Sequence, residues 1–233
     1  MPTTIIIPSR MYSTRLPGKP MKLVKGIPLV KRVYDACRET GLDTYVATDS
    51  MEIGELIQND AQVIMTPTEL RTGSDRVAHA AKQLGLSDDD LVVNVQGDLP
   101  FVSPALIFQM VYWMKFSGCK VATPAIRDES YKKGRITIAA TELMKAVYFS
   151  RSPIPHQTTD KESYFHHIGL YVYRNSVLQQ FASLPNGLLE DAESLEQLRF
   201  LENNLPIDIV ETTFDPKQEI NTQGDLDRVN NNE

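Results

Sequence analysis

The feature that most constrains the fold is an alternation of short β-branched runs with amphipathic helical segments. The first run, at residues 4–8, reads Thr-Ile-Ile-Ile-Pro, which is typical of a buried parallel strand ended by proline. Apolar side chains then recur at the helical spacing i, i+3, i+4, i+7, at Val30, Val33, Tyr34 and Cys37. Further strands are expected at residues 44–48, 62–65 and 91–96, and further helices at 52–58 and 74–84. This rhythm predicts a largely parallel sheet covered by helices on both faces.

The second half of the chain is less regular and predicts that the sheet becomes mixed. A helix is expected at residues 104–116, and strands at 120–124, 135–140, 170–173 and 207–211. A leucine stripe at residues 195, 198 and 201 indicates another helix. The final helix is expected at 222–229, with Asp225 placed for a capping-box start. We expect the polar tail at 230–233 to be frayed.

Composition excludes several classes of protein. Of the 233 residues, 42% are hydrophobic and 23% charged, which is ordinary for a globular protein. The net charge of −6 argues against a nucleic-acid partner. No apolar run approaches membrane-spanning length and no basic leader precedes the first strand, so we expect a cytoplasmic protein without a membrane partner. Cys37 and Cys119, the only cysteines, predict buried thiols and no disulfide framework.

A basic loop at residues 8–20 follows the first strand and is the first candidate site. It carries Arg10, Arg15 and Lys19. Ligands of open α/β sheets bind beyond the carboxyl ends of the strands, where loop amides and helix N-termini favour anions. Two arginine forks and a compact ammonium together suit a polyphosphate. The alternative for these residues is a solvated basic surface.

The same loop resembles a known family. Residues 7–10 and 15–20 are similar to the nucleotide-binding loop of CMP-Kdo synthetases, the 3-deoxy-manno-octulosonate cytidylyltransferases, in which alanine usually stands at the position of Ser9. Sialic acid cytidylyltransferases carry a related loop. Further segments match the first family in order, at residues 46–49, 72–76, 93–98, 148–151, 167–171 and 195–199.

This resemblance implies a fold and a reaction. The expected fold is a single Rossmann-like α/β nucleotidyltransferase domain over residues 1–233, with a mainly parallel, mixed central sheet. Its nucleotide-binding part would span about 1–125, and its acceptor-binding and dimerisation part about 126–233, in a homodimer. The implied reaction moves CMP from CTP to the anomeric hydroxyl of a 3-deoxy-octulosonate-type sugar acid and releases pyrophosphate. The product would serve bacterial-type surface polysaccharide or lipopolysaccharide synthesis.

The resemblance also assigns residues to roles. Those expected to hold the nucleotide are Arg10, Ser13, Arg15, Lys19, Thr72, Gly73, Ser74, Arg76 and Gln96. Those expected to hold the sugar acid are Arg151, His167, Tyr171, Glu196 and Gln197, each of which would otherwise be interpreted as a packing or surface residue. Arg15 and Lys19 are expected to stabilise transition-state charge. Such chemistry depends on positioning and electrostatics, so no serine or cysteine nucleophile is assigned.

A magnesium site is expected where the strand at 91–96 ends. Asp98 follows this strand, and a carboxylate there can coordinate a hard cation shared with triphosphate oxygens, so Mg²⁺ is the expected cofactor. Asn221 stands where the family usually supplies a second metal-binding aspartate. Its amide oxygen can bind Mg²⁺ but neutralises none of the charge, so binding should be weaker. Alternatively, Asn221 only shapes the loop before the last helix.

Two other departures from the family pattern occur near these motifs. Leu99 replaces a common glutamate, which changes the expected charge beside Asp98, and His166 replaces a common arginine, which leaves the acceptor's substituents open. Three alternative functions remain open. The acceptor could be a sialic-like or amino-modified acid. Leu99 and Asn221 could mark a non-catalytic CTP-binding homologue. The acidic triplet at residues 88–90 could indicate a metal-dependent glycosyltransferase, although it precedes its strand and resembles a solvated turn.

Overall fold

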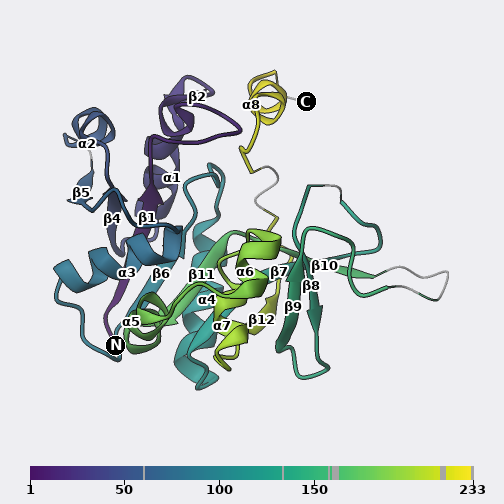
Figure 1. The fold of residues 1–233 in the computed structure, drawn as a ribbon. Helices are drawn as coiled ribbons and strands as arrows, with labels where there is room; N and C mark the ends of the chain where they lie inside the picture. Colours follow the sequence, from purple (N-terminus) through teal and green to yellow (C-terminus); the bar gives the residue numbers. More distant parts are fainter. Residues whose placement is uncertain (60, 133, 157, 159–162, 216–218, 232–233) are drawn as a thin grey trace.

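The structure is a computed structural model that describes the chain except residues 60, 133, 157, 159–162, 216–218 and 232–233 (Figure 1). Within the described residues, ten strands form one sheet in the order β5-β4-β1-β6-β11-β7-β10-β8-β9, and β12 pairs with β7. A separate two-stranded ribbon joins β2 (Leu23–Val24) to β3 (Ile27–Pro28). Every helix in this part of the chain is too short or too polar to cross a membrane.

The first half of the chain builds the parallel part of the sheet. Its strands are β1 (Thr3–Ser9), β4 (Asp43–Thr48), β5 (Gln62–Met65) and β6 (Leu91–Val95). The helices between them are α1 (Leu29–Arg38), α2 (Met51–Ile57) and α3 (Gly73–Gln83). β1 pairs in parallel with β4 on one side and with β6 on the other, so the direction of strand addition reverses at β1. Such a reversal opens a crevice beyond the carboxyl ends of the two central strands.

The second half adds mostly antiparallel strands. These are β7 (Val121–Asp128), β8 (Thr137–Ala140), β9 (Ala146–Ser150), β10 (Tyr164–His167), β11 (Leu170–Arg174) and β12 (Asp208–Glu211). The helices are α4 (Pro104–Phe116), α5 (Asn175–Ser183), α6 (Leu188–Glu193), α7 (Leu198–Glu202) and α8 (Gln223–Asn230). β11 lies between β6 and β7 and is antiparallel to both, which joins the two halves into one sheet. β7 continues across residue 125, the predicted division of the chain.

The core lies on both faces of this sheet. Side chains of a strand alternate between faces, so Ile5 and Ile7 of β1 pack with the cluster that contains α1, α2 and α4, whereas Ile6 packs with the cluster that contains α3 and α5. All three isoleucines are fully buried. The predicted α/β class, with a mixed sheet and helices on both faces, is confirmed.

Several local predictions need correction. β9, β10, α5 and α6 were not predicted, and the predicted leucine-striped helix begins only at Leu198, because Leu195 belongs to the preceding turn. Cys119 is half-buried rather than buried. Asn230 is not frayed: it ends α8, and its amide bonds to the ribbon at Leu23 O (3.0 Å) and Lys25 N (2.7 Å). The rest of the tail prediction at 232–233 lies outside the described residues.

Candidate active site

The basic loop after β1 is fixed to the core at two points. Leu16 and Pro20 are buried, while Arg10 and Arg15 are exposed. Gly18 has a φ of +66°, a left-handed conformation that glycine adopts without strain. This turn lets the Lys19 N–H bond to Leu16 O at 3.0 Å and starts the short helix η1 (Lys19–Met21). The loop therefore has a defined path, which directs Lys19 toward the end of β6.

Glycines shape the opposite wall, where β6 ends. A Cβ atom on Gly97 would lie 2.9 Å from Pro8 O, so only glycine allows the ends of β6 and β1 to approach this closely. The side chain of Gln96 lies between Gly73 and Gly169, where added Cβ atoms would come within 3.2 and 3.1 Å of it. The Gln96 N–H also bonds to Gly169 O at 3.0 Å. Gln96 is thus held at the mouth of the crevice.

Charged side chains from both walls meet the segment before α8. Lys19 Nζ donates to Asp98 Oδ2 at 2.9 Å and to Asn221 Oδ1 at 3.3 Å. Arg15 Nη2 donates to the same Asn221 oxygen at 3.0 Å. Asn221 Nδ2 in turn donates to Glu219 Oε2 at 3.2 Å. This cluster joins the expected catalytic residues Arg15, Lys19 and Asp98 to Asn221.

Glu219 is a member of this cluster that the sequence prediction missed. Its only sequence signal is a carboxylate two positions before Asn221. Burial, followed by the negative charge of Asp98, raises the pKa of Glu219 to about 7. The two carboxylates therefore lie close enough to repel one another, with Lys19 beside them.

Two adjoining cavities, of about 510 and 250 Å³, open at this edge of the sheet. Their shared wall contains Arg10, Arg15, Thr72, Gly73, Gln96 and Asp98. Of the residues predicted for the nucleotide, the smaller cavity adds Ser13, Lys19 and Arg76. The larger adds Arg151, His167, Tyr171, Glu196, Gln197 and Asn221, together with Glu219. Of all the predicted site residues, Ser74 alone lines neither of these two cavities.

The larger cavity contains buried polar groups without partners. His167 is 7% exposed and Gln197 is 4% exposed, and within the described residues the Nε2 atom of each has no hydrogen-bond partner. Burial lowers the pKa of His167 to about 3, against the opposing effect of Asp98, so the ring is neutral at physiological pH. The Tyr171 ring lies 5.2 Å from the His167 ring. Because buried polar groups are normally bonded, these atoms suit a polar ligand.

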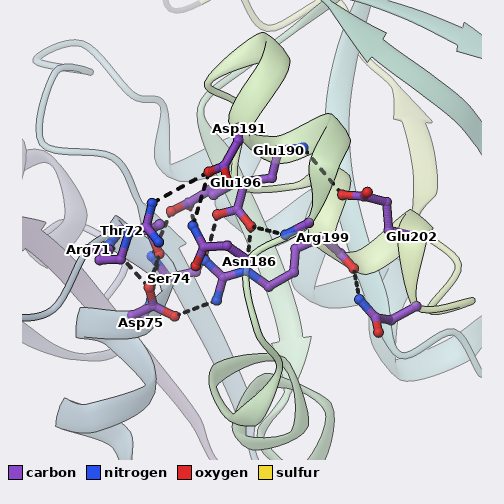
Figure 2. A network of polar contacts seen from close by, with 12 residues as sticks. Arg71, Thr72, Ser74, Asp75, Asn186, Glu190, Asp191, Glu196, Arg199 and Glu202 are labelled. Atoms are coloured by element: carbon purple, nitrogen blue, oxygen red, sulfur yellow. Dashed lines mark hydrogen bonds and ion pairs between the residues drawn. The ribbon is translucent and has the colours of Figure 1, made fainter.

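The N-terminus of α3 is bonded to the turn before α7, as Figure 2 shows. Thr72 caps α3 in a capping box with Asp75. Ser74 donates from its backbone N (3.2 Å) and its hydroxyl (2.7 Å) to the Glu196 carboxylate. Burial raises the pKa of Glu196, and the bonds from Ser74 oppose that shift. The Ser74 hydroxyl is thus already bonded within the protein. Its direct contact with a nucleotide stays a prediction.

Arg199 makes a second connection between these segments. It is 2% exposed, donates to both carboxylate oxygens of Glu190 at 2.7 and 2.6 Å, and donates to Asp75 at 2.9 Å (Figure 2). Its guanidinium also lies 4.2 Å from the centre of the Phe181 ring. No site role was predicted for Arg199, although the matching segment at 195–199 contains it. Arg199 fixes α6, a wall of the larger cavity, to the nucleotide-side helix α3.

Two arginines that do have predicted site roles also have partners within the protein. Arg76 is buried and donates to Asp49 at 2.7 Å and to the Thr66 hydroxyl. Arg151 donates to the backbone oxygens of Glu193 (2.8 Å) and Ser194 (3.0 Å). Both line a cavity, but each guanidinium also fixes the surrounding chain.

Of the family departures, only Asn221 belongs to the charged cluster. Leu99 is fully buried in the core and brings no charge to the cluster beside Asp98. His166 is fully buried with Nε2 3.1 Å from Ser130 O, and it does not line the larger cavity. The acidic triplet at 88–90 precedes β6, at the end of the strand opposite Asp98. The triplet does not line either cavity, so it does not support the glycosyltransferase alternative.

The cluster offers oxygen ligands that suit magnesium. In the described part of the chain, no three His, Cys, Asp or Glu side chains form a complete metal site. Mg²⁺ usually binds one or two carboxylates and takes its remaining ligands from substrate phosphates and water. Asp98, Asn221 and Glu219 supply two carboxylates and an amide oxygen beside a cationic loop. The residues present therefore fit the expected ion.

This fold and site define an α/β protein that binds an anionic ligand at the switch point of its sheet. Comparisons with known proteins make the class specific. A family model described as "Cytidylyltransferase" matches residues 4–211. A curated 3-deoxy-manno-octulosonate cytidylyltransferase from Rickettsia conorii is 42% identical over 209 residues, covering 87% of this chain and 84% of the relative. One from Hydrogenovibrio crunogenus, numbered 2, is 38% identical over 242 residues, covering 98% and 97%.

A solved structure agrees over nearly the whole length. It is a CMP:2-keto-3-deoxy-manno-octonic acid synthetase complexed with CTP, and it superposes with a TM-score of 0.90 at 31% identity, covering 99% of this chain and 98% of the other. The chain belongs to the 3-deoxy-manno-octulosonate cytidylyltransferase family.

Proposed function

We propose that this protein transfers the CMP group of CTP to the anomeric hydroxyl of 3-deoxy-manno-octulosonate and releases pyrophosphate. The observation that carries the proposal is the shared wall of the two cavities, where Arg15 and Asp98 lie between the nucleotide side and the acceptor side. A bond between two substrates forms where their sites meet. The names of the similar proteins support CTP and this sugar acid as the pair.

The reaction needs charge stabilisation more than a protein nucleophile. The anomeric oxygen attacks the α-phosphorus of CTP, the bond from that phosphorus to the oxygen bridging to the β-phosphate breaks, and the hydroxyl proton passes to water. Pyrophosphate leaves with the electrons of the broken bond. Arg15 and Lys19 stabilise the charge that develops on these oxygens, which is an effect of preorganised cations.

The acceptor cavity suits a hydroxylated acid. Neutral His167 and the Gln197 amide can each bond to sugar hydroxyls, because both have buried, unpartnered nitrogen atoms. Arg151, on the rim, provides a fork for a carboxylate. Binding by these residues would hold the anomeric hydroxyl toward the shared wall, and such positioning is a large part of catalysis in group transfer.

Magnesium is the proposed cofactor. Asp98 and Asn221 would hold it, and it would neutralise charge on the triphosphate oxygens. The homodimer and the cytoplasmic location stay predictions from the resemblance and from composition.

The direct test is pyrophosphate release from CTP with a panel of acids: 3-deoxy-manno-octulosonate, an amino-modified octulosonate and a sialic acid. The proposal expects the highest kcat/KM for 3-deoxy-manno-octulosonate. A preference for either of the other acids would move the assignment to that acceptor. Binding of CTP without turnover on any acid, at any Mg²⁺ concentration, would instead favour a non-catalytic homologue.

A further inference from the structure

Glu219 and Asn221 point into the same cavity for a simple geometric reason. Ile220 between them is fully buried, and its N–H bonds to Asp98 O at 2.9 Å. The side chains of its two neighbours lie together, since Asn221 Nδ2 donates to Glu219 Oε2 at 3.2 Å. The buried isoleucine therefore turns both polar neighbours toward the larger cavity, which both of them line.

The partners of Asn221 fix the orientation of its amide. Arg15 and Lys19 can only donate hydrogen bonds, so the atom facing them, at 3.0 and 3.3 Å, must be the carbonyl oxygen Oδ1. The amide nitrogen then faces Glu219 Oε2 at 3.2 Å. The neutral amide that stands where the family usually has an aspartate is thus bonded to a neighbouring carboxylate.

We propose that Glu219 is a metal ligand. Asp98 supplies one negative charge, and Glu219 supplies the second, which the neutral Asn221 lacks. This inference rests on the proposed magnesium-dependent function. The site then has two carboxylates, as a site with two aspartates would, and the amide oxygen of Asn221 remains as a further ligand.

The charges of the cluster support this role. Two cations, Arg15 and Lys19, lie against two carboxylates, Asp98 and Glu219, with Asn221 between them. A triphosphate competes for both cations, because arginine and lysine bind phosphate oxygens strongly. The carboxylates then lose the charges of Arg15 and Lys19, which leaves Arg135 as a cation acting on Glu219. A divalent cation arriving with the nucleotide would replace the lost charge.

A second observation indicates a polar ligand in this cavity. His167, nine-tenths buried, lines the same cavity with an unpartnered Nε2 atom, and the charge of Asp98 acts on its ring. Glu219 is therefore part of a site that already has an unsatisfied buried group, and not of an isolated acidic surface.

The test measures metal binding rather than turnover. Mn²⁺, which takes the same oxygen ligands, is titrated into the protein with CTP and no acceptor, and binding is followed by the relaxation rate of water protons, which separates the ternary complex from Mn²⁺–CTP alone. We expect Glu219→Gln to weaken Mn²⁺ in the ternary complex by at least about tenfold. CTP affinity in the presence of a chelator should stay unchanged, whereas a merely structural role would alter it.

Two further variants complete the experiment. The double variant Glu219→Gln with Asn221→Asp moves the carboxylate by two positions and should restore wild-type Mn²⁺ affinity. Glu211→Gln, an exposed carboxylate outside the larger cavity, is the matched control and should bind Mn²⁺ as wild type does. Unchanged Mn²⁺ affinity in folded Glu219→Gln, or no recovery in the double variant, would overturn the inference. If the wild-type protein with CTP binds no Mn²⁺, the proposed magnesium dependence itself fails.

Discussion

Lys19 Nζ lies 2.9 Å from Asp98 Oδ2, and this contact joins the loop after β1 to the end of β6. Both side chains are mostly buried, with 15% and 23% of their surfaces exposed. The pair therefore places a cation and a carboxylate at the point where the two cavities adjoin. The nucleotide phosphates would bind Lys19, and a metal would bind Asp98.

The first prediction concerns the loop cations. Lys19→Ala and Arg15→Ala should each lower kcat/KM by on the order of a hundredfold, because each removes a charge that stabilises the transition state, about 2–4 kcal/mol. Steady-state pyrophosphate release measures this loss. Lys115→Ala, on the exposed face of α4, is the control and should be fully active. Wild-type rates in both folded loop variants would remove the loop from the mechanism.

The second prediction separates a buried from an exposed ion pair. Arg199→Ala leaves Glu190 and Asp75 unpaired in the interior, so the free energy of unfolding should fall by about 3–5 kcal/mol. Arg71→Ala breaks an exposed pair with Asp191, whose side chains are 63% and 62% exposed, and should cost no more than about 1 kcal/mol. Urea unfolding of the two variants measures the difference. Equal losses would contradict the proposed connection between α3 and α6.

The third prediction is a dependence of stability on pH. The pKa of His167 is lowered from 6.5 to about 3 in the folded protein, so between these values the unfolded chain binds more protons. The contribution of His167 to the free energy of unfolding is therefore fully present above pH 6.5, and it is lost as the pH falls toward 3. The slope should reach up to about 1.4 kcal/mol per pH unit.

His167→Gln isolates this effect, because the other titrating groups remain. The unfolding free energy of the wild type should fall more steeply than that of the variant between pH 6.5 and pH 4. Parallel curves for the two proteins would mean that the His167 ring titrates normally.

The fourth prediction is selectivity for the nucleotide base. Most of the basic loop lines the smaller cavity, of about 250 Å³, and a pocket for a pyrimidine excludes the larger purine. We expect kcat/KM for CTP to exceed that for ATP by at least about tenfold with the same acceptor. Equal values would remove cytidine recognition from the proposal.

Much of the fold could be predicted from sequence because local patterns and burial agree in the first half. The β-branched runs of β1, β4, β5 and β6 lie close to their predicted positions, and α4 has the predicted bounds. β10 was missed because its sequence, Tyr-Phe-His-His, does not alternate between apolar and polar residues. Its polar His166 is buried because the ring bonds to a loop at Ser130 O. Such burial depends on tertiary partners that no local pattern specifies.

The candidate site shows the same limit. The loop cations and Asp98 could be predicted since motifs place them at strand ends, where ligands bind. Glu219 could not, because its position follows from the burial of Ile220 and the bond of that residue to Asp98 O. Arg199 was missed for a related reason, as its two carboxylate partners lie in α3 and α6.

The most direct test of the central claim is the stoichiometry of the reaction. The protein is incubated with CTP, Mg²⁺ and 3-deoxy-manno-octulosonate, and pyrophosphate and the CMP-linked sugar acid are quantified together by ³¹P NMR. We predict equal amounts of the two products from the wild-type protein and almost none from folded Asp98→Ala. Pyrophosphate formed without the CMP-linked acid, or full activity of Asp98→Ala, would contradict transfer of CMP at the shared wall of the two cavities.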